Sequence, residues 1–241
     1  MIHFKNVHIG YTSLLMTIEE LSLKAGEIYA LIGANGSGKT TLLNSIIGKT
    51  KLLSGELTLD AVSSKNILSR ELAKKIAFVE SRFDGVEFLS VRDYISLGRT
   101  PYTNAFGRLN SEDNALIDKV IDLMNLTEFS DRSTHELSDG ERQMASIARA
   151  LAQATPIIIL DEPTAFLDYG NRKKLIQTLT HISKLENKCI LFSSHDIDLC
   201  LEEKLPLLLV DQQQKELTLY PANTSKNELL RKGFNLESKP D

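Results

Sequence analysis

The most constraining feature of the chain is a glycine-rich stretch near its N-terminus. Residues 33–40 read Gly-Ala-Asn-Gly-Ser-Gly-Lys-Thr and fit the pattern G-x-x-x-x-G-K-[ST] at every fixed position. An apolar run at 28–32 precedes the stretch and a helix-compatible run at 41–47 follows it, so we expect it to join a buried strand to a helix. Glycines allow such a backbone to curl until successive N–H groups and the helix N-terminus face an anion. We call residues 33–40 the phosphate loop.

The residues of the phosphate loop have distinct expected roles. Lys39 would reach the β- and γ-phosphates of a nucleotide, and the Thr40 hydroxyl would be a ligand of Mg²⁺. An ordinary glycine-rich turn is the alternative, and the flanking strand and helix argue against it. The other nucleotide-binding candidates of this stretch are Gly33, Asn35, Gly36, Ser37, Gly38 and the adjacent Thr41.

Composition narrows the class of protein. A chain of 241 residues is long enough for one large domain or for a core with an inserted subdomain. A net charge of −4 is not the general footprint of a nucleic-acid-binding protein. No apolar run approaches the roughly 20 residues that span a bilayer, and residues 1–6 lack the apolar core of a signal peptide. Cys189 and Cys200 are expected as buried small hydrophobes in a reducing cytosol.

Hydrophobic patterning predicts an α/β chain interrupted by helices. Alternating segments predict antiparallel strands beside the phosphate loop, and 3.6-residue spacing between about 90 and 152 predicts a helical insertion. Two apolar runs on either side of a helix-like segment predict a βαβ unit, which a hairpin and a loosely packed polar tail from 221 follow. The expected strands are 2–7, 14–18, 55–59, 76–80, 157–160, 189–192, 207–210 and 216–220; the expected helices are 91–97, 114–124, 142–153 and 171–185.

Three groups of polar residues sit where such a fold binds ligands. Asp161 and Glu162 follow the buried strand at 157–160, where a carboxylate can hold Mg²⁺ and its neighbour can polarise an attacking water. His195 follows the strand at 189–192, where its ring N–H can contact a γ-phosphate or serve as a structural hydrogen bonder. Ser138 and Asp139 are good N-cap residues, and the helix end they precede can receive an anion.

The order of these motifs resembles that of ATP-binding subunits of ABC transporters, over about residues 2–222. The phosphate loop is similar to Walker A, 157–162 to Walker B with Glu162 as its catalytic glutamate, and 137–141 to the LSGGQ signature, imperfectly. Residues 165–168 resemble the D-loop, whose Asp168 is implied to couple the two subunits of a dimer, and His195 resembles the switch histidine. Tyr11 resembles the aromatic residue that stacks on adenine, with a packed strand tyrosine as the alternative.

The resemblance implies an α/β fold: a RecA-like P-loop NTPase core with an antiparallel β subdomain and an inserted α-helical subdomain. The ABC ATPase domain would span 1–222, with the core and β subdomain at about 1–81 and 154–222. The helical subdomain would lie at about 82–153, and 223–241 would be a polar C-terminal tail.

The resemblance also implies an activity and its partners. The chain would bind ATP and Mg²⁺, with Thr40 and Asp161 at the metal, and hydrolyse ATP in a homodimer. Ser138, Gly140 and Glu141 of one copy would complete the site of the other. Separate transmembrane permease subunits, an extracytoplasmic substrate-binding protein and no nucleic acid are the implied partners, and the cytoplasmic face of the cell membrane is the implied location. Residues 90–102, 148–153 and 160–168 look like those of importer ATPases for iron–siderophores, haem and cobalamin.

The chain departs from the family pattern at three positions. Ser81 stands where the family has the Q-loop glutamine, which suggests weakened or rerouted Mg²⁺ sensing, with adjacent Glu80 as a possible substitute. Asp139 replaces the first glycine of the signature, and Glu141 replaces its glutamine. A carboxylate beside a triphosphate is unfavourable unless it points away or caps the helix, and capping by Asp139 is the simpler hypothesis. Two alternatives stay open: a soluble ABC ATPase clamp acting on a non-transport partner, and a catalytically silent nucleotide switch.

Overall fold

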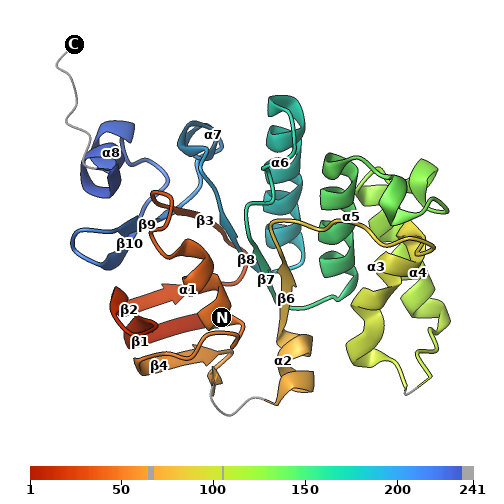
Figure 1. Ribbon diagram of the computed structural model, residues 1–241, viewed down its shortest axis with the longest axis horizontal. Coiled ribbons are helices and arrows are strands. Elements are labelled where there is room, and N and C mark those ends of the chain that lie inside the picture. Colours follow the sequence, from red (N-terminus) through yellow and green to blue (C-terminus); the bar gives the residue numbers. More distant parts are fainter. Residues whose placement is uncertain (65–67, 105, 235–241) are drawn as a thin grey trace. The chain divides into compact units, whose positions relative to one another are not determined.

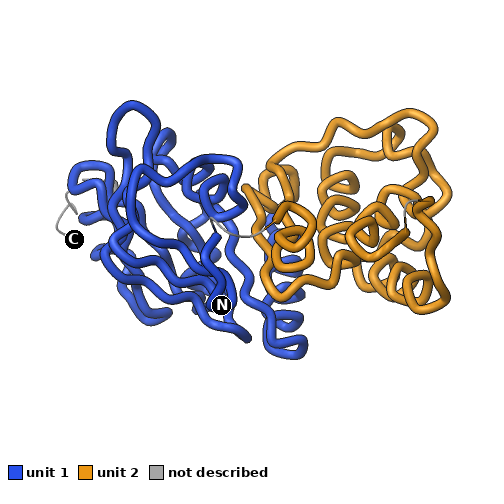
Figure 2. The backbone as a smooth tube through the Cα atoms, turned by 90° about the horizontal axis from the view of Figure 1, so that it is seen from below, with its two compact units in different colours: residues 1–67, 169–241 blue, residues 68–168 orange. Residues whose placement is uncertain are grey.

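The computed structural model describes residues 1–64, 68–104 and 106–234, and Figure 1 shows their helices and strands. The chain divides into two compact units, coloured separately in Figure 2. Unit 1 consists of Met1–Ile67 with Tyr169–Asp241, and unit 2 consists of Leu68–Asp168.

Unit 1 is built on a mixed sheet in which the strands are ordered β5-β4-β1-β2-β10-β9-β3-β8. The N-terminal strand β1 pairs antiparallel with both β2 and β4, whereas β3 pairs parallel with both β8 and β9. All residues of β3 and β8 are buried, as expected for parallel strands covered on both faces. The strands are β1 (Ile2–Gly10), β2 (Leu14–Leu23), β3 (Ile28–Ile32), β4 (Ser54–Leu59), β5 (Val62–Ser63), β8 (Cys189–Ser193), β9 (Leu207–Asp211) and β10 (Glu216–Tyr220).

The helices of unit 1 present apolar faces to this sheet. In α6 the buried Leu175, Ile176, Leu179 and Ile182 recur at three- and four-residue intervals, which places them on one face of the helix. That helix contacts β3 and β8. The helices of this unit are α1 (Lys39–Ile46), α6 (Tyr169–Leu185), α7 (Ile197–Glu202) and α8 (Lys226–Phe234).

Unit 2 combines a parallel strand pair with a group of helices. β6 pairs with β7 in register from Ile76 opposite Ile157 to Val79 opposite Leu160. The helices α3, α4 and η2 pack around α5. Gly98 permits this approach, because a Cβ there would lie 2.3 Å from the Arg149 carbonyl oxygen. The elements are α2 (Ser69–Lys75), β6 (Ile76–Val79), α3 (Val91–Ser96), η2 (Leu97–Tyr102), α4 (Ser111–Leu123), η3 (Thr127–Phe129), η4 (Thr134–Glu136), α5 (Asp139–Ala152) and β7 (Ile157–Leu160).

The tail after residue 221 differs from the sequence prediction. Part of it forms α8 rather than a loosely packed segment, and Leu229 of that helix is buried. The Lys226 ammonium lies 2.6 Å from an Asp198 carboxylate oxygen of α7, and the Lys232 ammonium lies 5.4 Å from the centre of the Tyr220 ring. The buried Leu229 and the contacts with α7 and β10 therefore help to order this mostly polar sequence. The domain boundaries near 81, 153 and 222 stay predictions.

Candidate functional site

The phosphate loop has the backbone conformation that its glycines predict. It joins the buried strand β3 to α1, which begins at Lys39. Gly36 has φ +74° and Gly38 has φ +98°, a left-handed conformation that side chains with a Cβ rarely adopt. A Cβ on Gly33 would lie 2.7 Å from the Ser37 hydroxyl oxygen, so the chain reverses tightly at the start of the loop. The loop is therefore shaped by its own glycines.

Lys39 places a cation against the phosphate loop. Its ammonium donates to the carbonyls of Gly33 at 2.8 Å and Ala34 at 3.2 Å, and the residue is only 6% exposed. Ser37 is also buried, and its hydroxyl has no hydrogen-bond partner among the residues that the structure describes. A buried ammonium and an unsatisfied buried hydroxyl on one glycine loop are suited to a ligand rich in anionic oxygens.

His195 lies at the same edge of the sheet as the phosphate loop. β3 and β8 are parallel with Leu31 opposite Ser193, and the Ser194 N–H donates to the Leu31 carbonyl at 3.0 Å. Gly33 lies two residues after Leu31, and His195 lies two residues after Ser193. Both residues therefore follow the carboxyl ends of neighbouring strands. His195 is exposed there, so its ring is accessible to a ligand. The structure thus brings together two motifs that are far apart in the sequence.

The remaining candidates of unit 1 also lie near the phosphate loop. Tyr11 is 65% exposed in the turn between β1 and β2, so the alternative of a packed strand tyrosine is wrong. The Cβ of Leu15, at the start of β2, lies 3.9 Å from the point where Gly38 would carry a Cβ, which puts the turn on the loop side of the sheet. Thr40 and Thr41 occupy the first turn of α1, and Thr40 is exposed.

Unit 2 carries a second set of strand-end residues. Asp161 follows β7, is 6% exposed, and its N–H donates to the Val79 carbonyl at the end of β6. Because β6 and β7 are parallel and in register, Glu80 and Ser81 leave the sheet beside Asp161 and Glu162. Glu162 has φ +48°, a left-handed conformation that costs a non-glycine residue energy and often marks a functional position.

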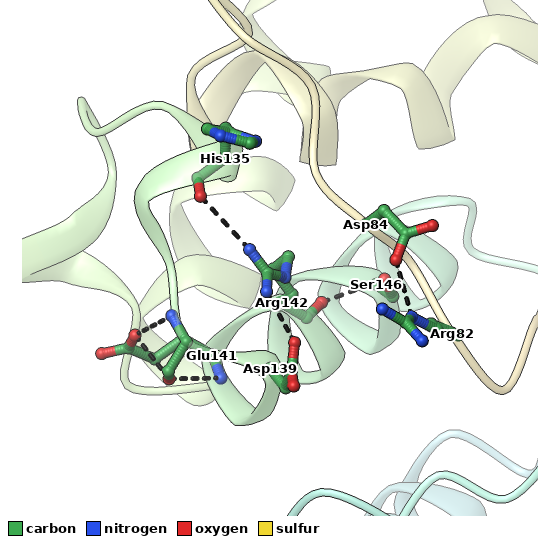
Figure 3. A network of polar contacts seen from close by, with 8 residues as sticks. Arg82, Asp84, His135, Asp139, Glu141, Arg142 and Ser146 are labelled. Carbon is green, nitrogen blue, oxygen red and sulfur yellow. Dashed lines mark hydrogen bonds and ion pairs between the residues drawn. The ribbon is translucent and has the colours of Figure 1, made fainter.

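The region resembling the signature forms a capped helix start (Figure 3). Ser138 is the N-cap of α5, and its hydroxyl accepts from the Glu141 N–H. The Glu141 carboxylate accepts at 2.7 Å from both the Ser138 hydroxyl and the Ser138 N–H, and these bonds lower its pKa. The negatively charged carboxylate of Glu141 is thus hydrogen-bonded to the start of its own helix.

Asp139 does not cap α5, contrary to the sequence hypothesis. Ser138 holds the cap position, and the Asp139 carboxylate pairs with the Arg142 guanidinium at 2.6 Å (Figure 3). The same guanidinium donates to the His135 carbonyl at 3.2 Å. Asp139 is the first helical residue, so its side chain faces a partner one turn along.

Gly140 and the stretch resembling the D-loop lie together in unit 2. A Cβ on Gly140 would lie 3.3 Å from the Phe166 carbonyl oxygen and 3.3 Å from a Leu167 methyl carbon. Asp168, at the end of that stretch, is exposed.

Sequence reasoning missed several residues that hold the site. Arg142 fixes Asp139, and the Phe83 ring stacks on Tyr94 with centroids 4.2 Å apart, anchoring the loop after Ser81 to α3. Arg172 of α6 pairs with Asp196, next to His195. A cation three residues after Asp139 was a local signal for the first pair, whereas no sequence signal marks the other two.

The residue types present fit a magnesium–nucleotide complex, with one candidate ligand on each unit. Thr40 offers a hydroxyl and Asp161 a carboxylate, and the described part of the chain holds no group of three or more His, Cys, Asp or Glu that could bind a metal by itself. Mg²⁺ is commonly held by one or two carboxylates together with substrate phosphates, so a sparse protein donor set is the expected one.

Cys189 and Cys200 are free and buried, and burial raises the pKa of each thiol to about 12.

Comparison with known proteins assigns the family. The sequence profile of the ABC transporter family matches residues 17–165. The chain belongs to the ABC transporter ATP-binding family. It is therefore an ATP-binding cassette ATPase, and the resemblance to the iron–siderophore importer group is confirmed. The iron(3+)-hydroxamate import ATP-binding protein FhuC of Bacillus subtilis is 33% identical over 192 residues, which cover 79% of this chain and 71% of FhuC.

Solved structures confirm the fold of this cassette. A metal-chelate type ABC transporter in an inward-facing conformation matches with TM-score 0.81 and 27% identity, covering 98% of this chain and 89% of that one. The ATP-binding cassette MJ0796, solved as a dimer in a post-hydrolysis state with ADP and Pi, matches with TM-score 0.80 and 26% identity, covering 93% of this chain and all of its own. The RecA-like core with its β and helical subdomains is thus confirmed. Among the described residues, no helix has the length and apolarity to cross a membrane.

Proposed function

We propose that this cassette powers a membrane transporter that imports an iron–siderophore, haem or cobalamin-type metal chelate. The name of FhuC states iron(3+)-hydroxamate import, and the transporter with TM-score 0.81 is described as metal-chelate type. The resemblance of residues 90–102 to such importers supports the same class of cargo.

The phosphate loop binds the triphosphate in this proposal. Lys39 neutralises the β- and γ-phosphates, exchanging its bonds with the Gly33 and Ala34 carbonyls for phosphate oxygens. Backbone N–H groups of the loop and the Ser37 hydroxyl supply further donors. Tyr11 stacks on the adenine from the turn between β1 and β2.

The metal is held by few protein groups. The Thr40 hydroxyl and the Asp161 carboxylate would bind Mg²⁺, with Ser81 or its neighbour Glu80 beside Asp161. Bound Mg²⁺ would neutralise phosphate charge as the terminal phosphoryl group leaves. Ser81 keeps a hydroxyl oxygen but lacks the reach of the family's glutamine, so Mg²⁺ sensing through this loop would be weaker than in the family.

Hydrolysis requires an oriented water. Glu162 orients the attacking water or accepts its proton, and the His195 ring N–H donates to the γ-phosphate. Positioning and charge neutralisation supply most of the barrier reduction in such reactions, because the protein forms no covalent intermediate.

The active unit is a homodimer in this proposal. MJ0796 was solved as a dimer with ADP and Pi. Ser138 and Gly140 of the second copy close the site over the γ-phosphate, with Glu141 beside them, and Asp168 couples the two copies. Glu141 and Asp139 already have partners within α5, which limits their repulsion of the nucleotide.

The membrane partner is a separate polypeptide. Permease subunits would contact the surface near Ser81 and residues 91–97, holding the cassette at the cytoplasmic face, and an extracytoplasmic protein would deliver the chelate. Recovery of a multispanning protein with the cassette from membranes supports this proposal, and recovery of only a soluble partner favours the clamp alternative.

One observation carries the proposed site: the buried Lys39 ammonium on the phosphate loop lies at the same sheet edge as His195. The decisive test is Glu162→Gln, measured by single-turnover ATP hydrolysis with separate measurement of ATP binding. We expect hydrolysis to fall by about 100-fold or more while binding persists. Glu56→Gln, an exposed glutamate on β4, is the matched control. Equal rates for wild type and Glu162→Gln would reject the role of Glu162.

A further inference from the structure

One face of α6 is joined to α7 and its N-cap by polar contacts. The Tyr169 hydroxyl and the Lys173 ammonium both bind the Glu202 carboxylate. Further along, the Gln177 amide donates to Glu203 at 3.1 Å. Positions 169, 173 and 177 are four residues apart and therefore lie on one face of a helix. The face also carries Arg172, one residue before Lys173.

Arg172 contacts α7 at the end that adjoins His195. Its guanidinium lies 3.5 Å from the Asp196 carboxylate. The other Asp196 carboxylate oxygen accepts from the Leu199 N–H at 3.1 Å, which caps α7, and the Asp196 N–H donates to the Ser194 hydroxyl at 3.0 Å. Asp196 thus joins three elements: α6, the cap of α7, and the end of β8.

The residues on both sides of His195 are therefore fixed. Ser194 is bonded to the Leu31 carbonyl of β3, the strand that leads into the phosphate loop. Asp196 is bonded to α6 and α7. With only one residue between these anchors, the backbone of His195 has little freedom, and its ring is aimed from a defined point beside the loop.

We propose that Arg172, acting through Asp196, is a positioning residue that holds His195 beside the phosphate loop. The inference rests on the proposed contact of His195 with the γ-phosphate. It adds a residue outside every motif and ties the helix that follows Asp168 to the loop that carries His195.

The energetics favour a positioning role over a structural one. The side chains of Arg172 and Asp196 are 35% and 24% exposed, and partly exposed ion pairs of this kind contribute little to the stability of the fold. Helices as short as α7 are held by their contacts rather than by intrinsic stability. Loss of the pair would leave the fold intact but release the segment after His195, and a misplacement of about 1 Å can cost about 100-fold in rate.

The test compares Arg172→Gln, Asp196→Asn and Arg172→Lys in the full chain by ATP hydrolysis. We expect kcat to fall about tenfold or more in the first two variants with KM changed less than about twofold, because binding groups are untouched. Asp196→Asn keeps an N-cap residue and removes only the charge. Arg172→Lys keeps the positive charge, so it should hydrolyse ATP faster than Arg172→Gln. Lys173→Gln is the matched control, because it removes the neighbouring ion pairs with Glu202 and Glu203 and leaves Asp196 alone.

A double mutant separates this inference from the proposed function. In a His195→Ala background, Arg172→Gln should cause no further loss, since it acts through the histidine. Backbone hydrogen exchange at 194–199 should rise in Arg172→Gln without nucleotide. An additive double mutant, an equal loss in Lys173→Gln, or unchanged exchange would overturn the inference while His195 keeps its role. If His195→Ala hydrolyses ATP like wild type, the proposed role of His195 fails and the inference fails with it.

Discussion

At the scale of single residues, the departures from the family signature are compensated inside one helix. A carboxylate at 139 or 141 would repel a triphosphate if it were unpaired. Arg142 neutralises Asp139, and the Ser138 cap binds the Glu141 carboxylate. Both carboxylates are paired with residues three positions away in the same helix end, so the pairing needs no residue from another element. In the proposed dimer, the Ser138 hydroxyl would have to release Glu141 before it could donate to a nucleotide.

Glu141→Gln tests the cap. We expect the free energy of unfolding at pH 7 to fall by about 0.5–1 kcal/mol, because a charge-assisted bond at the N-cap is lost. The folded-state pKa of Glu141 lies below its ordinary value, 4.5, so the stabilisation is present above pH 4.5 and is lost as the pH falls through the lowered pKa. Urea unfolding at pH 7 and near pH 3 measures both effects, and the difference between wild type and variant should shrink at the lower pH.

The control for this prediction is Glu112→Gln. Glu112 also lies in the first turn of a helix, but the capping-box residue there is Asp113. It should change stability by at most a few tenths of a kcal/mol. An equal loss at both pH values in Glu141→Gln would contradict the assignment of the charge to the cap.

At the scale of elements, one buried ion pair ties the helices of unit 2. Arg99 of η2 contacts Asp113 of α4 at 2.8 Å, with side chains 12% and 7% exposed, and also donates to the Ala152 carbonyl at the end of α5. Three elements thus meet at one guanidinium, which stacks over Tyr102.

Arg99→Met should destabilise the protein by about 3 kcal/mol, because it leaves the Asp113 carboxylate buried without its cation. Arg92→Met is the matched control: Arg92 pairs with Asp118, but both side chains are more than a third exposed, so the loss should stay below about 1 kcal/mol. Chemical denaturation of both variants measures the difference. Equal losses would show that burial of the Arg99 pair does not set its contribution.

Most elements were predictable because their signals are local. Apolar runs gave β3, β7 and β8, and helical spacing gave α4 and α6, within a few residues of the observed ends. The predicted start of α5 at residue 142 lies three residues after the observed start at Asp139, because the stretch 137–141 was assigned to the segment before the helix, although Ser138 was correctly named as a good N-cap residue. The helix α8 was missed because its sequence is mostly polar, so the buried Leu229 adds little periodic signal.

At the scale of the whole molecule, the motifs are divided between the two units. Unit 1 carries the phosphate loop and His195, and unit 2 carries Asp161, Glu162 and the signature-like stretch 137–141. In the proposed dimer, Lys39 of one copy works with Ser138 of the other.

A mixing experiment tests this division. Lys39→Ala and Ser138→Arg should each abolish ATP hydrolysis when pure. Mixed in equal amounts, half of the dimers would pair one variant with the other and keep one intact composite site, so about a quarter of wild-type activity should return if the sites are independent. If hydrolysis requires both sites of a dimer to be intact, the mixture should stay inactive. Sedimentation should then still show that the mixed variants form dimers when ATP is added. No recovery of either quantity would contradict composite sites.

Contiguous residues were enough to predict the glycine-rich loop, the strand and helix that flank it, and the family. These features depend on contiguous residues, whose spacing sets backbone conformation directly. The contacts around these motifs became visible only in the folded chain: the Lys39 ammonium binds the loop carbonyls, the Asp139 carboxylate pairs with Arg142 instead of capping α5, and Arg172 pairs with Asp196 beside His195. Such contacts depend on which side-chain atoms packing brings within hydrogen-bond distance, and residue order alone does not specify that distance.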